Sequence, residues 1–266
     1  MNAEVQEAAE PKLYLLDIEG TVAPISFVTE QLFPYAQKHF AAFLRPRLGE
    51  PDIQADLALL AKENHADYEP GHPEYAGLNS DPGGYAALNY LLWQMDRDRK
   101  STALKSLQGK IWKAGFESGE LKSVLFADVP AALQSWSARS RVAIYSSGSV
   151  EAQQLFFRHS IYGDLTPLIS SYFDTRTGPK TEIASYVAIS TAMQVATQET
   201  IFFSDAVAEL DAARKADCHT RLVAREGNAP IAYEHFHARV ETLEGIWSAG
   251  REPQEDKPDP GDGNSD

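Results

Sequence analysis

At 266 residues, 43% of them hydrophobic, the chain is long enough for one large domain or for a core domain with an inserted second domain. Its formal net charge of −14 argues against non-specific nucleic-acid binding, which needs a basic face, and against adhesion to anionic membranes. Half of this charge lies in residues 1–10 (three acids, no base) and 251–266 (six acids, two bases), which we expect to be flexible and disordered, respectively.

The first predicted strand is the apolar run Leu13–Leu16, which leads directly into Asp17-Ile18-Glu19-Gly20-Thr21. The carboxyl ends of parallel strands form the ligand-binding edge of an open α/β sheet, so Asp17 and Glu19 are candidates for a site there. Carboxylates in such a place can hold Mg²⁺ or attack an electrophile such as phosphorus. On its own this motif is weak, and its significance depends on three later elements.

Residues 25–125 lose the strand–helix rhythm, and we expect them to form a helical cap inserted into the core. The spacing of apolar residues predicts helices at 25–48, with a kink or a break at Pro34, and at 53–65, 84–100 and 102–115. Residues 64–84 are rich in proline and glycine and are expected to form a long loop.

The core resumes near Phe126, and the next strand, at 141–145, ends at Ser146-Ser147-Gly148 before a helix at 150–159. Hydroxyls and backbone N–H groups at a helix N-terminus form an anion site that suits phosphate. These three residues are therefore candidates for phosphate binding, with an ordinary serine N-cap as the alternative.

Lys180 follows a Gly-Pro turn and stands at the start of a helix predicted over 180–195. A cation at a helix N-terminus opposes the macrodipole, which suggests that Lys180 serves a ligand or a carboxylate. The alternative is a solvated surface lysine.

A third apolar strand, at 200–204, ends at Asp205, just before a helix predicted over 207–216. Asp205 is a further candidate for the ligand-binding edge, with a simple helix N-cap as the alternative. On the same helix, Glu209 and Asp211 suit either a supporting role around a metal or the acidic charge that stabilises early helical turns.

The lone cysteine, Cys218, leads into a strand predicted over 219–224 and is expected to be a buried structural thiol. We expect a closing helix over 231–247, which packs on the core through four apolar residues: Phe236, Val240, Leu243 and Trp247. His235 and His237 are expected at the surface.

Alternating strands and helices predict an α/β fold with a doubly wound parallel sheet. We expect residues 11–24 and 126–250 to form this core and residues 25–125 to form the cap.

The order strand–Asp-x-acid, strand–Ser, Lys, strand–Asp resembles the haloacid dehalogenase superfamily of aspartate-nucleophile phosphohydrolases, which has a Rossmann-like core. Within it, the chain is most similar to the enolase-phosphatases of the methionine salvage pathway, over residues 13–229. Glu19 stands where most of the superfamily has Asp, and the enolase-phosphatases resemble the branch with Glu. The closer similarity is carried by three stretches, namely 16–21 with 33–35, 93–100 with 102–105 and 107–109, and 145–153. Residues 126–129 also fit.

The resemblance implies that Asp17 is the nucleophile and that Mg²⁺ is held by Asp17, the backbone carbonyl of Glu19 and Asp205. The Glu19 side chain would act as acid and then as base. Four residues would hold the phosphate: Ser146, Ser147, Gly148 and Lys180. The implied reaction is enolisation of 2,3-diketo-5-methylthiopentyl-1-phosphate and removal of its phosphate, giving the acireductone 1,2-dihydroxy-3-keto-5-methylthiopentene. The enolisation base stays open among Glu19, a cap residue and a group relayed by serine.

In the expected cap, Trp93, Met95 and Trp112 are candidates for a pocket around the methylthio group, since thioethers suit aromatic and Met surfaces. Packing inside the cap is the simpler interpretation for each. The charge run over 96–100 is typical of a solvated helix end, although the resemblance makes one of its bases, or Lys105, a candidate for substrate contact.

Three other functions are weighed against this interpretation. A related phosphatase acting on another small phosphate ester would share all of the core motifs. A dehalogenase would not need Lys180, Glu19 and Asp205 gathered around a metal. A non-catalytic binding protein on this scaffold would more readily have lost Asp17, Lys180 or Asp205. The histidines show no H-E-x-x-H pattern, which argues against zinc.

No apolar run approaches the roughly 18 residues of a membrane span, and the first residues lack the basic and apolar regions of a signal sequence. Together with the lone cysteine, this predicts a cytoplasmic protein with a small phosphorylated substrate and without nucleic-acid or membrane partners. We expect a monomer, since no apolar stretch is left over from core and cap.

Overall fold

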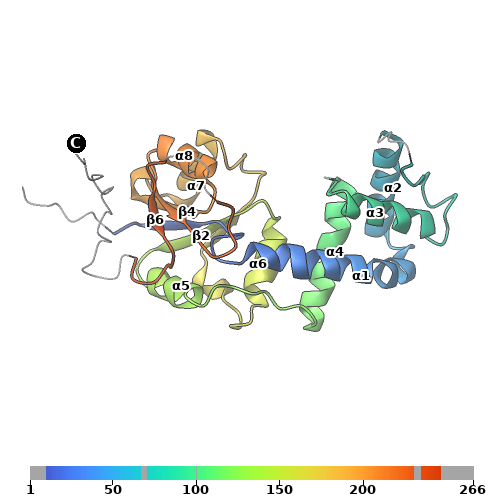
Figure 1. Ribbon diagram of the computed structural model, residues 1–266, viewed down its shortest axis with the longest axis horizontal. Coiled ribbons are helices and arrows are strands. Elements are labelled where there is room, and N and C mark those ends of the chain that lie inside the picture. Colours follow the sequence, from blue (N-terminus) through green and yellow to red (C-terminus); the bar gives the residue numbers. More distant parts are fainter. Residues whose placement is uncertain (1–9, 67–70, 100, 231–234, 247–266) are drawn as a thin grey trace, which may run out of the picture. The chain divides into compact units, whose positions relative to one another are not determined.

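The computed structural model describes residues 10–66, 71–99, 101–230 and 235–246, which fall into two compact units (Figure 1). The first unit holds the described residues up to Pro24, Leu125–Val150 and those from Leu165 onward, and the second holds Ile25–Val124 and Glu151–Asp164. The expected flexible start and the expected disordered tail lie, apart from Glu10, outside the described residues.

The first unit is built on a six-stranded parallel sheet in the order β3-β2-β1-β4-β5-β6. Its strands are β1 (Leu13–Leu16), β2 (Arg141–Tyr145), β3 (Ser171–Phe173), β4 (Thr200–Ser204), β5 (His219–Val223) and β6 (Ala238–Val240). The chain order reverses on either side of β1, so the carboxyl ends of β1, β2 and β4 meet where such sheets bind ligands. The predicted doubly wound α/β fold is confirmed.

Helices cover both faces of this sheet, which explains why its central strands β1, β2 and β4 are almost entirely buried and mostly apolar. They are α5 (Val129–Ser137), α7 (Ile183–Met193) and α8 (Val207–Lys215), with short 3₁₀ turns at Thr166–Leu168 and Thr197–Glu199. Figure 1 shows α7 and α8 on one side and α5 on the other. Successive side chains of β1 point to opposite faces of the sheet. Leu15 packs on the side of α7 and α8, whereas Tyr14 stacks on Trp136 of α5 with ring centroids 4.4 Å apart.

The predicted closing helix is wrong in its described part. Residues 238–240 form β6, and the N–H of Ala224 donates to the carbonyl of Val240 at 2.8 Å. Phe236 is 88% exposed, whereas Leu243 is buried as expected; Trp247 lies outside the described residues. Apolar residues three and four apart suggested a helix, but pairing with the exposed edge of β5 satisfies the backbone of this segment as a strand. Strand β3 and helix α5 also escaped prediction.

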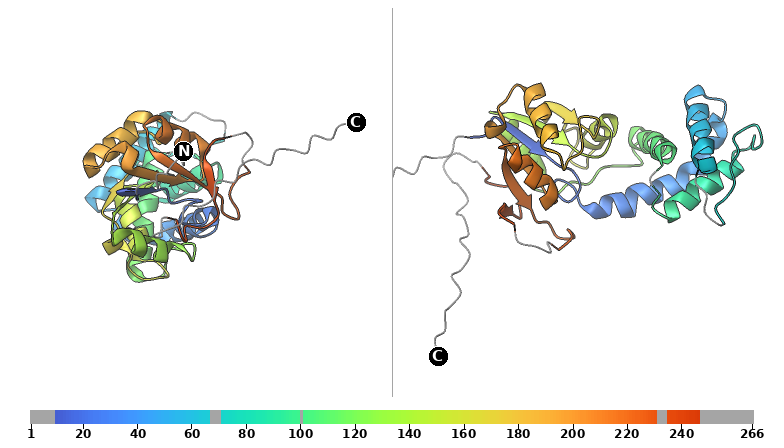
Figure 2. Two further views of the ribbon diagram at one scale, coloured as in Figure 1. Left: turned by 90° about the vertical axis from the view of Figure 1, so that its left-hand side faces the viewer. Right: turned by 90° about the horizontal axis from the view of Figure 1, so that it is seen from above.

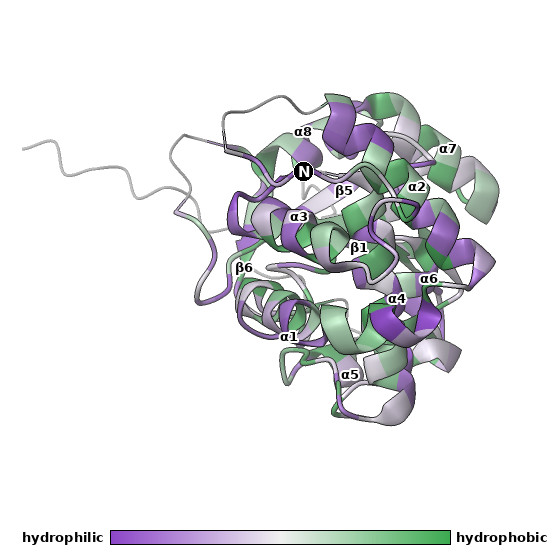
Figure 3. Cartoon of the chain, turned by 90° about the vertical axis from the view of Figure 1, so that its right-hand side faces the viewer, coloured by the Kyte–Doolittle hydropathy of each residue, from purple (hydrophilic) through white to green (hydrophobic). Residues whose placement is uncertain are grey.

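The second unit is helical, as predicted. It contains α1 (Phe33–Leu44), α2 (Pro51–Ala66), α3 (Tyr85–Asp96), α4 (Thr102–Ser118) and α6 (Val150–Arg158), whose first residue is assigned to the other unit, together with a π-helical turn at Phe27–Leu32 and a 3₁₀ turn at Arg45–Arg47. The break expected at Pro34 falls where the π-helical turn gives way to α1. Figure 2 shows α1 to α4 crossing one another, and Figure 3 shows hydrophobic and hydrophilic residues alternating along them.

Residues 151–164 were expected in the core, yet they belong to the second unit. The reason is a set of contacts with the last residues of the inserted block. The N–H of Ser123 donates to the carbonyl of His159 at 3.0 Å, and the Ser123 hydroxyl donates to the carbonyl of Phe156. The Phe156 ring also meets Phe27 edge-on, with centroids 5.7 Å apart.

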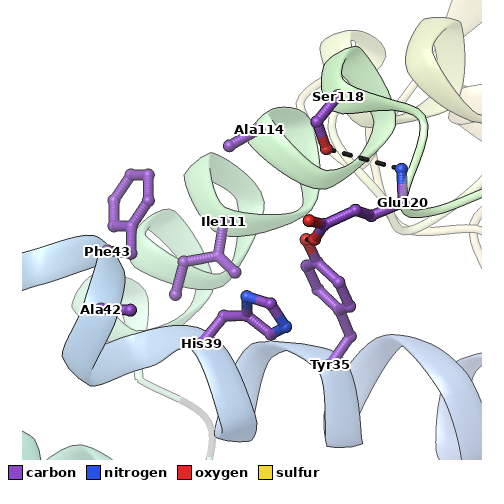
Figure 4. Close-up of a pocket in the computed structure, with 8 residues that line it drawn as sticks. All are labelled: Tyr35, His39, Ala42, Phe43, Ile111, Ala114, Ser118 and Glu120. Atoms are coloured by element: carbon purple, nitrogen blue, oxygen red, sulfur yellow. Dashed lines mark hydrogen bonds between the residues drawn. The ribbon is translucent and has the colours of Figure 1, made fainter.

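A hollow of about 240 Å³ lies between α1 and α4 (Figure 4). Its wall includes Tyr35, whose hydroxyl donates to Glu120 at 2.8 Å and whose ring stacks on His39. A Cβ added at Gly115 would meet the Tyr35 ring at 2.7 Å, so the glycine makes room for this ring. None of the predicted site residues lines the hollow.

In the part of the chain that the structure describes, no helix is both long and apolar enough to cross a membrane. Cys218 is buried, as predicted, and burial raises the pKa of its thiol to about 12.

Candidate active site

Asp17 stands directly after β1, and the structure holds it between the ends of two strands. Its N–H donates to the carbonyl of Phe203 in β4 at 3.0 Å, and only 6% of the residue is exposed. The chain then turns sharply: the N–H groups of Val22 and Ala23 donate to the carbonyl of Ile18 at 2.9 Å. Glu19 lies in this turn and is exposed, in contrast to Asp17.

Lys180 reaches Asp17 directly. Its Nζ lies 2.6 Å from Asp17 Oδ1 and 2.7 Å from Glu209 Oε2, and 10% of its side chain is exposed. The alternative of a solvated surface lysine is therefore wrong. Burial alone would lower the pKa of Lys180, but the attraction of Asp17 and Glu209 outweighs it and holds the pKa above its ordinary value.

Three hydroxyls fix the turn that carries Lys180. Tyr145 donates to the carbonyl of Gly178 at 2.8 Å, Ser185 to that of Pro179 at 2.7 Å, and Tyr186 to that of Lys180 at 2.6 Å. Helix α7 begins at Ile183, so Lys180 precedes the helix and was predicted to lie within it. The ammonium is held by the turn rather than by the helix end.

Asp205 follows β4 and lies against the turn after Asp17. A Cβ added at Gly20, whose φ is +71°, would come within 2.3 Å of Asp205 Oδ2, so this turn requires glycine. Burial, together with the charges of Asp17 and Glu209, raises the pKa of Asp205 to about 6. The N-cap of α8 is Ala206, so Asp205 is not the simple helix cap that was the alternative.

Glu209 belongs to the same cluster, although its sequence allowed a purely helix-stabilising role. Besides Lys180, it accepts a hydrogen bond from the Ser204 hydroxyl at 2.9 Å. Burial and the nearby charge of Asp17 raise the pKa of its carboxyl. The sequence indicated that Glu209 could lie near Asp205, because it follows Asp205 by four residues, one helical turn, in the first turn of α8.

Asp211, the other acid considered on α8, faces elsewhere. It lies 3.0 Å from Nε2 of His237, whose Nδ1 is 2.8 Å from the Thr220 hydroxyl. The His237 side chain is 1% exposed, so its predicted surface position is wrong. This trio joins α8, β5 and the segment before β6.

The serine segment lies at the carboxyl end of β2, the strand beside β1. Ser146 is buried and its hydroxyl accepts from the N–H of Gly148 at 3.4 Å, whereas Ser147 is exposed. Asp174, which follows the unpredicted strand β3, accepts from the N–H of Val150 at 3.3 Å. Asp174 therefore contacts the first turn of α6, and sequence reasoning missed it because β3 was missed.

The aromatic candidates in the second unit are packed there. Trp93 is 8% exposed in the hydrophobic cluster of that unit, and Trp112 donates from Nε1 to the carbonyl of Leu32 at 2.8 Å. The guanidinium groups of Arg97 and Arg99 lie 4.6 and 5.3 Å from the Trp93 ring. Arg97 and Arg99, two of the basic residues in the predicted charge run, thus make cation–π contacts with Trp93. Lys100 lies outside the described residues.

Comparison with known proteins shows the family of this chain. A family model described as haloacid dehalogenase-like hydrolase matches residues 11–217. Enolase-phosphatase E1 of Synechococcus elongatus is 51% identical over 82% of this chain and 90% of its own length. The chain belongs to the enolase-phosphatase family of haloacid dehalogenase-like hydrolases. Enolase-phosphatase E1 of Leptospira borgpetersenii is 43% identical over 88% of this chain and 97% of its own. The resemblance inferred from the motifs is confirmed.

Solved structures of other proteins share the fold of this enolase-phosphatase. The UTR4 protein of Saccharomyces cerevisiae matches with a TM-score of 0.66 and 34% identity, over 89% of this chain and 100% of that one. CbbY of Rhodobacter sphaeroides, at 13% identity, matches with a TM-score of 0.56 over 89% of this chain and 96% of that one, which speaks for the fold alone.

The acidic cluster of this enolase-phosphatase fits a divalent cation. The Lys180 ammonium pairs with the carboxylates of Asp17 and Glu209, and burial together with repulsion from these two carboxylates raises the pKa of Asp205. Among the described residues no three acidic, histidine or cysteine side chains form a complete metal cage. Two carboxylates plus a backbone carbonyl match the sparse protein ligation that Mg²⁺ accepts alongside water and phosphate.

Proposed function

We propose that this chain enolises 2,3-diketo-5-methylthiopentyl-1-phosphate and then removes its phosphate, giving the acireductone 1,2-dihydroxy-3-keto-5-methylthiopentene. The names and identities of its relatives support the substrate. The observation that carries the chemistry is the 2.6 Å contact between Asp17 and Lys180 at the end of the central strand. It orders a carboxylate and neutralises part of its charge where phosphate oxygens can be received.

Asp17 is the proposed nucleophile. Lys180 engages Oδ1, which leaves Oδ2 of the same carboxylate to attack phosphorus in line. The bond to the leaving oxygen breaks as the new bond forms, and the phosphoryl group passes to Asp17 as an acyl phosphate. A water molecule then attacks phosphorus and returns the carboxylate.

Glu19 is the proposed proton-transfer group. It lies two residues beyond the nucleophile on the exposed side of the turn, where a bound substrate would meet it. It gives its proton to the departing oxygen and afterwards takes one from the attacking water. An enol leaving group is less basic than an alkoxide, so modest acid assistance suffices.

Lys180 is the proposed charge stabiliser. Its ammonium is buried and held by two carboxylates, so it needs no reorganisation when charge develops on the phosphoryl oxygens. Three further residues are proposed to bind the phosphate: Ser146, Ser147 and Gly148. Glu209 is proposed to help keep the ammonium in place through its 2.7 Å contact with Nζ.

Mg²⁺ is the proposed cofactor, with Asp17, the backbone carbonyl of Glu19 and Asp205 as the residues that would hold it. When bound, it supplies charge neutralisation and alignment of phosphate and nucleophile. We also propose that the protein is a cytoplasmic monomer; the lone buried thiol accords with the cytoplasmic location.

The test uses purified protein, Mg²⁺ and the diketone phosphate. Phosphate release and the ultraviolet absorbance of the enol are followed together. Transient enol absorbance that precedes phosphate release is the expected result. Phosphate release from simple esters such as p-nitrophenyl phosphate, with no reaction of the diketone, would instead favour a related phosphatase with another small substrate.

A further inference from the structure

Two side chains from the loop after β5 hold the turn that follows Asp17. Nδ2 of Asn228 donates to the carbonyl of Gly20 at 2.9 Å and to that of Val223 at 3.1 Å. Nε of Arg225 donates to the carbonyl of Thr21 at 3.2 Å. The turn after β1 is thus tied to the end of β5, a strand that is not its neighbour in the sheet.

Arg225 is itself immobilised, which makes it a firm support. Its side chain is 6% exposed, and its Nη2 donates to Asp128 at 2.8 Å while Nη1 donates to the carbonyl of Glu241 at 2.8 Å. Asp128 also accepts from the N–H of Leu243 at 2.6 Å. These bonds link Asp128, the residue directly before α5, to the segment after β6.

The geometry of Gly20 explains why this support matters to chemistry. A Cβ there would lie 2.3 Å from Asp205 Oδ2 and 3.1 Å from Asn228 Oδ1, so the turn fits closely between these two side chains. A small shift of the Gly20 carbonyl would move Glu19 and change the approach of Asp205. Errors of this kind, transmitted from outside the reacting groups, cost enzymes about 10- to 100-fold in activity or metal affinity.

We propose that Asn228 and Arg225 are positioning residues for phosphoryl transfer, which set the place of the Gly20–Thr21 turn relative to Asp205. The inference rests on the proposed function of Asp17. It differs from a purely structural role because it ties these two hydrogen-bond donors to cation affinity and turnover, not to stability alone.

The test compares two alanine variants, each of which removes hydrogen bonds between an asparagine side chain and the backbone. Asn228→Ala loses the bonds to the Gly20 and Val223 carbonyls. Asn64→Ala is the matched control, because Asn64 bonds the carbonyl of Pro73 and the N–H of Tyr75 within the second unit. Calorimetric titration measures Mg²⁺ binding without substrate, thermal unfolding measures stability, and kcat/KM is measured with saturating Mg²⁺.

The expected result is that Asn228→Ala weakens Mg²⁺ binding and lowers kcat/KM, each by about 10-fold, whereas Asn64→Ala lowers the unfolding temperature alone. Arg225→Lys keeps a cation beside Asp128 but has no Nε donor, and should act in the same direction. A folded Asn228→Ala protein with Mg²⁺ affinity and kcat/KM within twofold of the parent would overturn the proposal. If the parent itself releases no phosphate, the proposed function fails; the Mg²⁺ titration still tests the positioning role.

Discussion

Lys180 Nζ lies 2.6 Å from Asp17 Oδ1 and 2.7 Å from Glu209 Oε2, so one buried ammonium links the end of β1 to the first turn of α8. The bridge brings together three segments that are far apart in the chain. It also means that Asp17, the proposed nucleophile, is coupled electrostatically to Lys180 and Glu209.

Replacing Asp17 with Asn should abolish phosphate release while the fold persists. The amide has nearly the shape of the carboxylate but is not a nucleophile, and Glu209 still neutralises Lys180. We expect a loss of at least about 10³-fold in kcat, measured by phosphate release, with an unchanged circular dichroism spectrum. Turnover near that of the parent would remove Asp17 from its assigned role.

Replacing Lys180 with Met should destabilise the protein as well as inactivate it. The change leaves the buried carboxylates of Asp17 and Glu209 without their cation, and breaking a buried ion pair from one side costs about 3 kcal/mol. Urea unfolding at pH 8 measures the loss. The loss should be smaller at pH 5, because the carboxyls of Glu209 and Asp205 have raised pKa values and take up protons as the pH falls.

Lys113→Met is the matched control for that experiment. Its partner is Glu151 at 2.6 Å, but both side chains are exposed, so solvent screens the pair. We expect a change in unfolding free energy below about 1 kcal/mol. An equal loss of unfolding free energy in the two variants would mean that the burial of the Lys180 ion pairs does not add to their effect on stability.

Removing divalent cations should inactivate the enzyme reversibly. The excess of carboxylates over ammonium groups around Asp17 leaves negative charge that an anionic phosphate cannot approach unaided. EDTA should therefore abolish phosphate release, and added Mg²⁺ should restore it. Full activity in excess chelator would contradict the assigned ligand set.

The contribution of His237 to stability should fall as the pH drops below about 6.5. Burial lowers the pKa of its ring below the ordinary value of 6.5, and the opposing effect of Asp211 does not compensate. Between the lowered pKa and 6.5 the unfolded chain binds more protons, so the free energy of unfolding rises with pH in that window. The contribution is fully present above pH 6.5 and is lost as the pH falls through the folded-state value.

The measurement is urea unfolding at half-unit steps from pH 5 to pH 7.5, for the parent and for His237→Gln. The variant should be less stable at pH 7.5 and should show a flatter dependence on pH. An unchanged slope would assign the acid sensitivity to other groups.

Local sequence determined the elements that carry the site. The three central strands, β1, β2 and β4, are short and mostly apolar because both faces of the sheet are covered. They are followed directly by Asp17, Ser146 and Asp205, whose side chains can bind ligands or react. The parallel arrangement then brings those ends to one edge, which is why strand pattern and motif order were enough for the fold, the family and the candidate residues.

Only the tertiary structure decided which partners these residues have. The local sequence does not distinguish a buried Lys180 from a surface one, a Glu209 paired with Lys180 from a purely helix-stabilising acid, or a buried His237 from an exposed one. Burial and pairing depend on segments distant in sequence, and the same holds for β6, where the open edge of β5 overrode a helical spacing of apolar residues. The short-range sequence pattern determines which helices and strands form. Long-range contacts determine the burial, the pKa and the hydrogen-bond partners of each side chain.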